Sequence, residues 1–455
     1  MKNHNLRLFL IISLLFIAYS CQPKAAPEEL PNIVLLIGDD QGYPYFGFMG
    51  ADYVQTPHMD QLARSGLLFE YGYVPDNHCR PSLATLMTGI QPVEYKRRVE
   101  ELMVEKGIKE EDRREFEHHA MQYFETLPKL LAQKGYKSFQ GGKWWEYNYQ
   151  NGGFTHGMTN GCTPKDREQG GKWFKQFMGG DGLNLARATM QPVYDFITEN
   201  KDDPFFIWYA PELPHYPFDA PDKYYNLYKN KDMSESAKRY YANCTWFDEG
   251  VGELQMFLRK QGEFKNTLFI YVNDNGWEQD PDQEFRHDSL RWHNGGDKGK
   301  IALHDQSFRT PIIFSWYGKI NPGGISRALI HSADIPATIL DYVGIKPPEN
   351  YFGTSYRSIL NGTHGNMRVS IAGRVNVMRS EEDMMGKQIE GYWYKNRDGW
   401  FYITNLTTGE KLLLAAWGGR ATQTNQVKAR PDLVAKFEEE IAGWRRKYYP
   451  EKPTP

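Results

Sequence analysis

Four apolar, strand-like runs in this sequence are each followed within a few residues by polar groups suited to a site. "NIVLLIG" leads into Asp39-Asp40, "GYKSFQGG" into Lys143, "PFFIWYAPELP" into His215, and "NTLFIYVN" into Asp274-Asn275-Gly276. Helical patterns lie between these runs, such as "FETLPKLLAQKG", which stops at Gly135, and a segment at about 185–200. Strands that alternate with helices predict an α/β fold with a large, mostly parallel sheet sandwiched by helices.

The polar residues at these four strand ends are predicted to form one site. In an open parallel sheet, ligands bind beyond the carboxyl ends of the strands. Four of the residues, Asp39, Asp40, Asp274 and Asn275, offer only oxygen ligands. Such ligands suit a hard cation, Ca²⁺ or Mg²⁺, better than zinc. An isolated Asp-Asp or Asp-Asn-Gly is usually a turn, but two such groups at the ends of buried strands favour a metal site.

The chain changes character after the Pro/Gly-rich segment 344–362, which we interpret as a linker. Aromatic and β-branched runs broken at Asp398-Gly399 and Thr408-Gly409 predict antiparallel hairpins. A helix follows, opened by Pro431, with one apolar face made of Leu433, Val434, Phe437, Ile441 and Trp444. We therefore predict a catalytic domain at 31–360 and a small α+β subdomain at 365–455. The highly charged, helix-prone residues 94–119 are interpreted as a solvated insertion.

Composition narrows the class of protein. The chain has 455 residues, of which 40% are hydrophobic and 24% charged, which is ordinary for a soluble globular protein. The formal net charge of −3 gives no electrostatic attraction for nucleic acid. Aromatic residues reach 15%; most are expected to pack in the core, and part of them can form a surface on which sugars stack.

The N-terminus has the pattern of an export signal. Lys2 and Arg7 precede the apolar run "LFLIISLLFIA", which is too short to span a bilayer comfortably, and Ser20-Cys21 follow. We predict a lipoprotein signal peptide at 1–21, lipid attachment at Cys21, and a tether at 22–30. The alternative is a cleaved signal without lipid. The expected location is the periplasm or the outer membrane, with the lipid as the sole membrane anchor.

The number of cysteines raises a question about Cys79. The chain has four Cys, and with Cys21 set aside three remain, an odd number for an oxidising compartment. Cys162 and Cys244 either pair or stay as buried thiols. Cys79 stands just before Arg80-Pro81, and proline suits the first turn of a helix, so Cys79 is expected near a helix N-terminus, which favours anions. The plain alternative is a capping or redox cysteine.

The segment "CRPSLATLMTG", which begins at Cys79, closely resembles the activation motif of the type I, formylglycine-dependent sulfatases of the alkaline phosphatase superfamily. Further segments resemble that family in order and spacing over about residues 31–360: "PNIVLLIGDDQG", "TPHMDQLARSGLLFEYGYV", "GGKWW", "PELPHYP", "VNDNG", "GGDKGKIALHDQSFRTPIIF" and "SADIPATILDYVGI". In that family a sulfatase-maturating enzyme oxidises the cysteine to formylglycine, whose hydrate is the nucleophile. The resemblance implies an alkaline phosphatase/sulfatase-like fold and hydrolysis of sulfate esters, and the expected substrates are sulfated oligo- or polysaccharides.

The resemblance also implies roles for individual residues. Asp39, Asp40, Asp274, Asn275 and an oxygen of modified Cys79 would hold Ca²⁺ or Mg²⁺. Lys143 and Lys298 would neutralise charge on the sulfate. His215 would hydrogen-bond the bridging oxygen and help protonate the leaving alcohol.

Two positions depart from the family pattern. Leu83 stands where the family has an arginine that supports the formylglycine, and Trp145 where it has a histidine that assists loss of sulfate. Arg80, His78 and His293 are the hypothetical substitutes. The departures leave two alternatives open: a phosphodiester or phosphomonoester hydrolase of the same superfamily, and a catalytically silent, carbohydrate-binding surface lipoprotein. Substrate specificity is expected to lie in the loops 91–120, 144–185 and 276–297.

Overall fold

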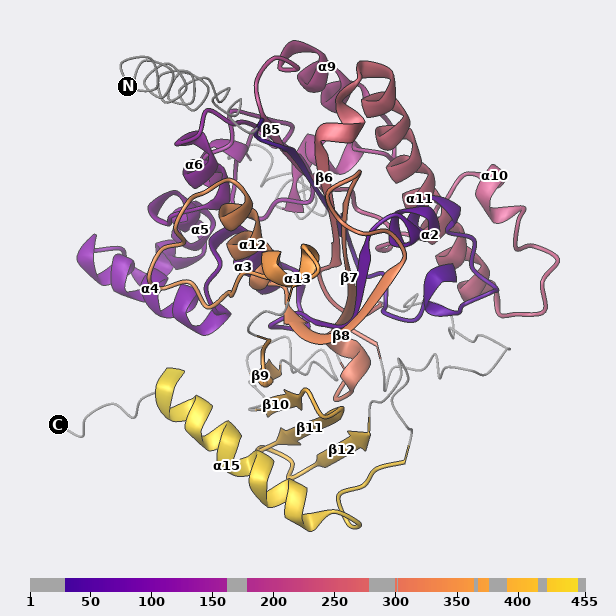
Figure 1. The fold of residues 1–455 in the computed structure, drawn as a ribbon. Coiled ribbons are helices and arrows are strands. Elements are labelled where there is room, and N and C mark those ends of the chain that lie inside the picture. Colours follow the sequence, from indigo (N-terminus) through magenta and orange to yellow (C-terminus); the bar gives the residue numbers. More distant parts are fainter. Residues whose placement is uncertain are drawn as a thin grey trace, which may run out of the picture.

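The computed structural model describes residues 29–161, 178–277, 299–300, 302–363, 367–375, 391–415 and 424–448. Its main feature is an eight-stranded sheet with helices on both faces (Figure 1). A separate four-stranded sheet with one long helix lies beside it, drawn at the bottom of Figure 1. This arrangement confirms the predicted fold class, and the domain boundaries at 31–360 and 365–455 stay predictions.

The large sheet has the strand order β4-β3-β5-β1-β6-β7-β2-β8. In that order, the strands are β4 (His156–Gly157), β3 (Lys137–Gly142), β5 (Phe205–Ala210), β1 (Asn32–Gly38), β6 (Thr267–Asn273), β7 (Arg309–Trp316), β2 (Leu67–Tyr73) and β8 (Gly324–His331). β7 is antiparallel to both of its neighbours, and every other pairing is parallel. The four strands predicted from the apolar runs, β3, β5, β1 and β6, are therefore neighbours that run in one direction.

Helices cover both faces of the large sheet. One group packs on the first face: α3 (Cys79–Thr88), α4 (Pro92–Glu105), α5 (Arg113–His119), α6 (Leu127–Ala132), α12 (Asp334–Tyr342) and α13 (Arg357–Leu360). A second group packs on the other face: α2 (Pro57–Arg64), α9 (Gln191–Glu199), α10 (Asp222–Tyr225) and α11 (Glu235–Gln261). Successive residues of β1 enter the two cores alternately, Ile33 and Leu35 on one side and Val34 on the other. This double burial explains why β1 is apolar throughout.

Short 3-10 helices join these elements. They are η1 (Gly47–Met49), η2 (Glu110–Asp112), η3 (Ala120–Tyr123), η4 (Tyr149–Gly152), η5 (Gly180–Asn184), η6 (Glu263–Asn266) and η7 (Asp305–Ser307). The predicted helix before Gly135 is α6, and Gly135 takes the left-handed conformation expected of a stop residue, with φ +83°. The helix predicted at about 185–200 starts later, at Gln191, with Pro192 in its first turn, where proline is favoured; before it, Ala186 has a left-handed backbone with φ +60°.

The C-terminal unit has the predicted hairpins and helix. β9 (Ser370–Val375), β10 (Gly391–Asn396), β11 (Trp400–Asn405) and β12 (Lys411–Ala415) form an antiparallel sheet, and α15 (Pro431–Tyr448) packs on it. Gly399 and Gly409 take left-handed backbones at the turns, with φ +87° and +76°. Phe437 and Ile441 of α15 are buried against the sheet, as their spacing predicts.

The segment 94–119 is not merely a solvated insertion, so that interpretation was wrong. Its helices α4 and α5 bury Val99, Leu102, Met103 and Phe116 in the core on the first face of the large sheet. Charged residues dominate the composition of this segment, but they occupy the outer faces of amphipathic helices, as in the pair between Arg97 and Glu101.

The interpretation of 344–362 as a linker was also wrong. Tyr356 is completely buried, and its hydroxyl donates a hydrogen bond to the backbone carbonyl of Leu329 on β8. The segment therefore packs on the large sheet instead of spanning between two units. Beyond it, Trp393 of β10 stacks on Tyr73 of β2, with ring centroids 5.8 Å apart, so the two sheets share a core.

Several predictions fall outside the described residues, including the signal peptide, Cys21, the tether up to residue 28, and Cys162. Cys244 is a buried free thiol in α11. Among the described helices, none combines the length and apolar character needed to cross a membrane.

Candidate active site

The carboxyl ends of the parallel strands bring the predicted residues together at one edge of the large sheet. Asp39 and Asp40 follow β1, Lys143 follows β3, His215 comes a few residues after β5, and Asp274-Asn275 follow β6. β2 runs in the same direction, so Cys79, which starts α3 after β2, lies at this edge too. The convergence that the sequence predicts is present in the structure.

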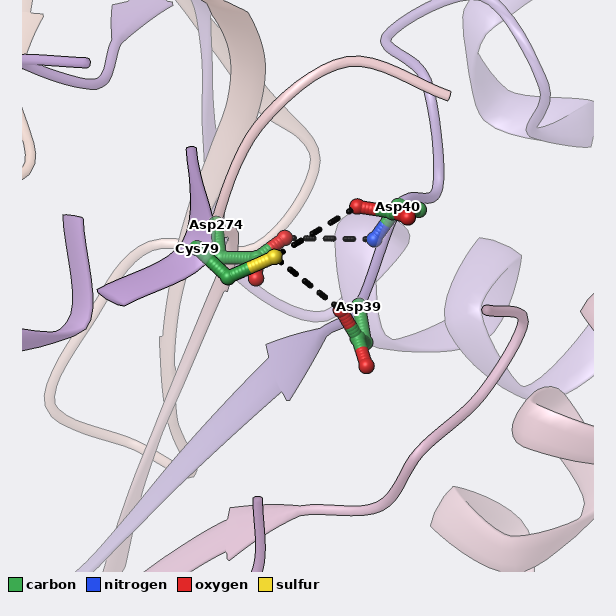
Figure 2. Close-up of side chains that lie close together, drawn as sticks. All are labelled: Asp39, Asp40, Cys79 and Asp274. Atoms are coloured by element: carbon green, nitrogen blue, oxygen red, sulfur yellow. Dashed lines mark hydrogen bonds between the residues drawn. The ribbon is translucent and has the colours of Figure 1, made fainter. Parts of the chain in front are cut away.

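Three carboxylates and a thiol form the centre of the site. One ligand atom from each of Asp39, Asp40, Cys79 and Asp274 lies within 4.8 Å of the others, and Figure 2 shows these side chains facing one another. Successive side chains of a strand normally point to opposite faces. Asp39 and Asp40 nevertheless both face Cys79, because the backbone of Asp40 is left-handed, with φ +62°. The backbone N–H of Asp40 donates to Asp274 Oδ1 over 3.1 Å.

The donor set fits a hard divalent cation. Asp39 Oδ2, Asp274 Oδ2 and Asn275 Oδ1 are buried acceptors that make no hydrogen bond within the described part of the chain. Buried acceptors of this kind are costly unless something pairs with them, and a cation such as Ca²⁺ or Mg²⁺ does so with oxygen ligands. Burial, together with the nearby charge of Asp39, raises the pKa of Asp274 well above its usual range. A cation would relieve that repulsion.

Cys79 is held at the N-terminus of α3 by contacts from three strand ends. Its Sγ accepts hydrogen bonds from Lys143 Nζ at 3.2 Å and from Asn275 Nδ2 at 3.3 Å, and it lies 3.8 Å from Asp39 Oδ1. Burial, with the charge of Asp274 in addition, raises the pKa of the thiol well above its usual range. The unmodified thiol is therefore protonated and a poor nucleophile, since reactive cysteines have a lowered pKa.

Lys143 is a fixed positive charge inside this cluster. It is completely enclosed, and its Nζ donates to Asp39 Oδ1 over 2.6 Å. Burial alone lowers the pKa of a lysine, but the charges of Asp39 and Cys79 outweigh that effect and raise the pKa of Lys143. The ammonium group is thus ready to neutralise an anionic ligand.

A second lysine at the site was missed by sequence reasoning. Lys300 Nζ donates to Asp40 Oδ2 over 2.9 Å. Burial raises the pKa of Asp40, but Lys300, His215 and Lys143 overcome this and hold that pKa below its usual range. The family resemblance points instead to Lys298 in "GGDKGK"; Lys298 lies outside the described residues, and its role stays a prediction. The signal for Lys300 was a second lysine two residues further on in the same segment.

His215 lies near the same carboxylate oxygen of Asp40 as Lys300. Its Nε2 is 3.6 Å from Asp40 Oδ2, and its Nδ1 contacts the backbone carbonyl of Tyr216. A carbonyl accepts only, so Nδ1 carries the proton and Nε2 is presented to the site. Burial lowers the pKa of His215 to about 4, although the charge of Asp39 acts in the opposite direction.

The two departures from the family pattern occupy different surroundings. Leu83 is buried in the core on the first face of the large sheet. Trp145 lies beside the site, where its ring is 5.7 Å from Lys143 Nζ. The backbone carbonyl of Trp145 accepts a hydrogen bond of 2.6 Å from His118 Nδ1, a contact that the sequence did not indicate. Burial, followed by the charge of Arg80, lowers the pKa of His118 to about 2, so this ring is neutral.

Two of the proposed substitutes, Arg80 and His78, adjoin Cys79 in sequence, and their side chains contact other partners. Arg80 Nε donates to Glu146 Oε1 over 3.0 Å, and Arg80 also donates to the backbone carbonyl of Glu117. His78 Nδ1 lies 3.4 Å from Asp76 Oδ1. His293 lies outside the described residues. The roles of Arg80, His78 and His293 stay hypotheses.

Comparison with known proteins decides the family. The family model described as Sulfatase matches residues 31–345. The chain belongs to the sulfatase family. The match begins just before β1 and extends beyond α12, so it includes every described residue of the site.

Curated sulfatases match the chain at low identity. An N-acetylgalactosamine-6-sulfatase of Rattus norvegicus is 27% identical over 368 residues, which cover 72% of this chain and 64% of the relative. This sulfatase-family chain thus spans less than two thirds of that relative's length. An arylsulfatase of Clostridium perfringens is 23% identical over 465 residues, covering 84% of this chain and 91% of the relative.

Solved structures confirm the fold. The crystal structure of Ps i-CgsB in complex with k-i-k-neocarrahexaose superposes with a TM-score of 0.68 at 21% identity, covering 91% of this chain and 93% of that one. The phosphonate monoester hydrolase of Agrobacterium radiobacter superposes with a TM-score of 0.65 at 14% identity, covering 92% and 96%. At these identities the likeness is one of fold.

Proposed function

We propose that this sulfatase-family protein hydrolyses sulfate esters of carbohydrates. The observation that carries the proposal is the position of Cys79, at the start of α3, with its Sγ in contact with Lys143 and Asn275 and facing the carboxylates of Asp39 and Asp40. The names of two similar proteins support a carbohydrate substrate: one is an N-acetylgalactosamine-6-sulfatase, and the other was crystallised with k-i-k-neocarrahexaose.

Cys79 is proposed to be converted to formylglycine by a sulfatase-maturating enzyme, which would turn an inert thiol into the source of the nucleophilic oxygen. The cation site would be formed by Asp39, Asp40, Asp274 and Asn275 together with the modified residue. A Ca²⁺ or Mg²⁺ ion bound there would supply positive charge for the sulfate oxygens and orient the nucleophile.

The remaining residues would neutralise the charge of the sulfate and protonate the leaving oxygen. Lys143 and Lys300 present ammonium groups at Asp39 and Asp40 respectively, and would neutralise sulfate oxygens. Lys298 is retained as a further candidate for this role. His215 would deliver a proton from Nε2 to the bridging oxygen as the bond to sulfur breaks, so that the sugar leaves as a neutral alcohol. That step requires His215 to be protonated in the complex with substrate.

A phosphodiester or phosphomonoester hydrolase is the second candidate. Leu83 and Trp145 remove an arginine and a histidine typical of the sulfatase motif, and the fold is shared with a phosphonate monoester hydrolase. A surface lipoprotein that binds carbohydrate without turning it over is the third. The clustering of three carboxylates with Lys143 and Lys300 speaks against the third, because a binding protein would gain nothing from these buried charges.

Peptide mass spectrometry across Cys79, on protein from the native host, tests the proposal directly. We expect formylglycine at position 79 and release of sulfate from members of a panel of sulfated sugars. The Cys79→Ala variant should release none. An unmodified cysteine, with turnover of phosphate esters in place of sulfate esters, would support the second candidate. Unmodified protein that binds sugars without any turnover would support the third.

We also propose that the protein is exported and lipid-anchored at Cys21. The short apolar run and the Ser20-Cys21 pair carry this proposal. The wild type should fractionate with membranes, and Cys21→Ser should move it to the soluble fraction. A wild type that is already soluble and lacks lipid would contradict the anchor.

A further inference from the structure

A cavity lies on the flank of α3, beside the candidate active site. It has a volume of about 320 Å³ and is built from elements distant in sequence: the loop after β2, α3, the start of α4, α5, β9 and α15. The unit built on the large sheet and the C-terminal unit therefore both contribute to its wall. The lining residues that matter here are Asp76, Arg80, Gln91, Lys96, Arg374 and Trp444.

The wall combines two aromatic rings with hydrogen-bond donors and acceptors. Trp444 and Tyr95 contribute rings, Lys96 and Arg374 contribute donors, and Asp76 contributes acceptors. Sugar hydroxyls donate and accept, and sugar rings have apolar faces that aromatic rings cover. A pocket selective for a simple anion would carry donors alone. The mixture therefore matches a polyhydroxylated ring.

Gln91 gives an independent indication that a ligand is missing from this cavity. It lines the cavity and is 1% exposed, yet its Nε2 has no hydrogen-bond partner among the residues that the structure describes. Buried amide donors in proteins are almost always paired, because leaving one unpaired costs free energy. A hydroxyl oxygen of a ligand in the cavity would accept this hydrogen bond.

A continuous chain of contacts joins the cavity to the active site. Arg80, in the cavity wall, directly follows Cys79 and donates to Glu146. Glu146 directly follows Trp145, whose ring faces Lys143 Nζ at 5.7 Å. The cavity wall and the candidate active site are therefore linked through two adjacent pairs of residues, Cys79-Arg80 and Trp145-Glu146, and the contact between Arg80 and Glu146 joins the pairs.

We propose that this cavity is a glycan subsite, which binds a sugar residue of the substrate chain other than the one whose sulfate is removed. The inference rests on the proposed function, because the sugar is taken to belong to the same glycan. The segment that forms α4 supplies Tyr95 and Lys96, and α15 supplies Trp444. The subsite would make the protein prefer oligosaccharides to single sulfated sugars.

Binding without turnover tests the subsite apart from catalysis. The Cys79→Ser protein is titrated calorimetrically with sulfated monosaccharides and with hexasaccharides prepared from sulfated galactans and from chondroitin sulfate. At least one hexasaccharide should bind at least tenfold more tightly than the monosaccharides do. Trp444→Ala and Lys96→Ala should each weaken hexasaccharide binding by about tenfold. Trp400→Ala and Lys109→Ala are matched controls on the same units but outside the cavity, and they should leave hexasaccharide binding unchanged. Lys96 is exposed, so its variant keeps the test valid if Trp444→Ala does not fold.

The outcomes separate this inference from the proposed function. A lower affinity of Trp444→Ala and Lys96→Ala for the hexasaccharide supports the subsite, even if the native enzyme releases no sulfate. Sulfate release with equal affinity for monosaccharides and hexasaccharides would overturn the subsite and leave the proposed function standing. Equal affinities of parent, Trp444→Ala and Lys96→Ala, or no binding of any hexasaccharide, would also overturn it.

Discussion

Lys300 and Asp40 form a direct ion pair at the active site, with Lys300 Nζ 2.9 Å from Asp40 Oδ2. Lys143 pairs with the neighbouring carboxylate, Asp39, over 2.6 Å. Each of the two adjacent carboxylates therefore has its own lysine. The arrangement keeps two ammonium groups beside Cys79 while leaving further carboxylate oxygens for a cation.

Lys300→Ala should lower kcat/KM for a sulfate ester by about 100- to 1,000-fold, the usual effect of removing one preorganised charge or donor at a reacting centre. Steady-state kinetics on an aryl sulfate measure the effect, with circular dichroism to check the fold. Lys298→Ala, two residues away, is the matched comparison. If Lys298→Ala shows the large loss and Lys300→Ala does not, the assignment of Lys300 to the site is wrong.

The convergence of the site was predictable because it depends on topology. Parallel strands all present their carboxyl ends at one edge, so Asp39, Lys143 and Asp274 had to meet once the strands were recognised. The choice between Lys298 and Lys300 was not predictable in the same way, because both lie in one polar segment and only the path of the backbone decides which side chain reaches Asp40.

Other features escaped prediction for related reasons. The composition of 94–119 hid the apolar stripe of α4, because charged residues outnumber the few that are buried, such as Val99 and Leu102. The left-handed backbone of Asp40 left no sequence signal, since aspartate adopts this conformation only occasionally. The cavity between α3, α4 and α15 is lined by residues as far apart in sequence as Arg80 and Trp444, and no local pattern predicts that they share it.

Replacing Asp39 and Asp40 together by asparagine should abolish binding of Ca²⁺ or Mg²⁺. The substitution keeps side-chain volume but removes two of the three clustered charges. In the parent, Ca²⁺ at about 100 times its Kd should stabilise the fold by about 2.7 kcal/mol, and this gain should vanish in the variant. Elemental analysis and thermal unfolding with and without Ca²⁺ measure both effects.

Asp222→Asn, an exposed change at the start of α10, is the control and should retain the cation. Stoichiometric Ca²⁺ or Mg²⁺ in the double variant would show that the cation binds elsewhere. Stoichiometric zinc in the parent, with neither Ca²⁺ nor Mg²⁺, would contradict the choice of a hard cation.

His215→Ala should slow hydrolysis of a sugar sulfate by about 100- to 10,000-fold, the range expected for a lost general acid. An aryl sulfate should be affected much less, because a phenolate leaves without needing a proton. Comparing kcat for the two substrates measures the difference. His156→Ala, on β4, is the control, and its effect on kcat should be the same for both substrates. Equal slowing of both substrates would mean that His215 does not protonate the leaving oxygen.

Lys395 of β10 is buried where the two sheets meet. It has no exposed surface, its Nζ lies 5.1 Å from the ring centre of Tyr71 and 5.8 Å from that of Tyr73, and within the described residues it makes no hydrogen bond. Burial lowers its pKa to about 7, although the charge of Asp305 acts in the opposite direction. A charged ammonium group is therefore unfavourable at this position in the folded protein.

Because Lys395 is buried, we expect its contribution to the free energy of unfolding to increase with pH. Between pH 7 and the ordinary pKa of 10.5, the unfolded chain binds a proton that folded Lys395 does not, so stability increases by up to about 1.4 kcal/mol per pH unit. Below pH 7 both states bind the proton, and the full penalty is present. Lys395→Met removes the penalty and should therefore be more stable than the parent at pH 6, by several kcal/mol.

The gap between Lys395→Met and the parent should narrow steadily from pH 7 to pH 10. Urea unfolding of both proteins across this range measures it, and the difference between them cancels the contributions of all other titrating groups. Lys428→Met is the matched control, because Lys428 is exposed in the same C-terminal unit and should show no pH-dependent difference from the parent. A gap between Lys395→Met and the parent that is constant with pH would mean that folded Lys395 keeps its proton throughout, and that Asp305 compensates for its burial.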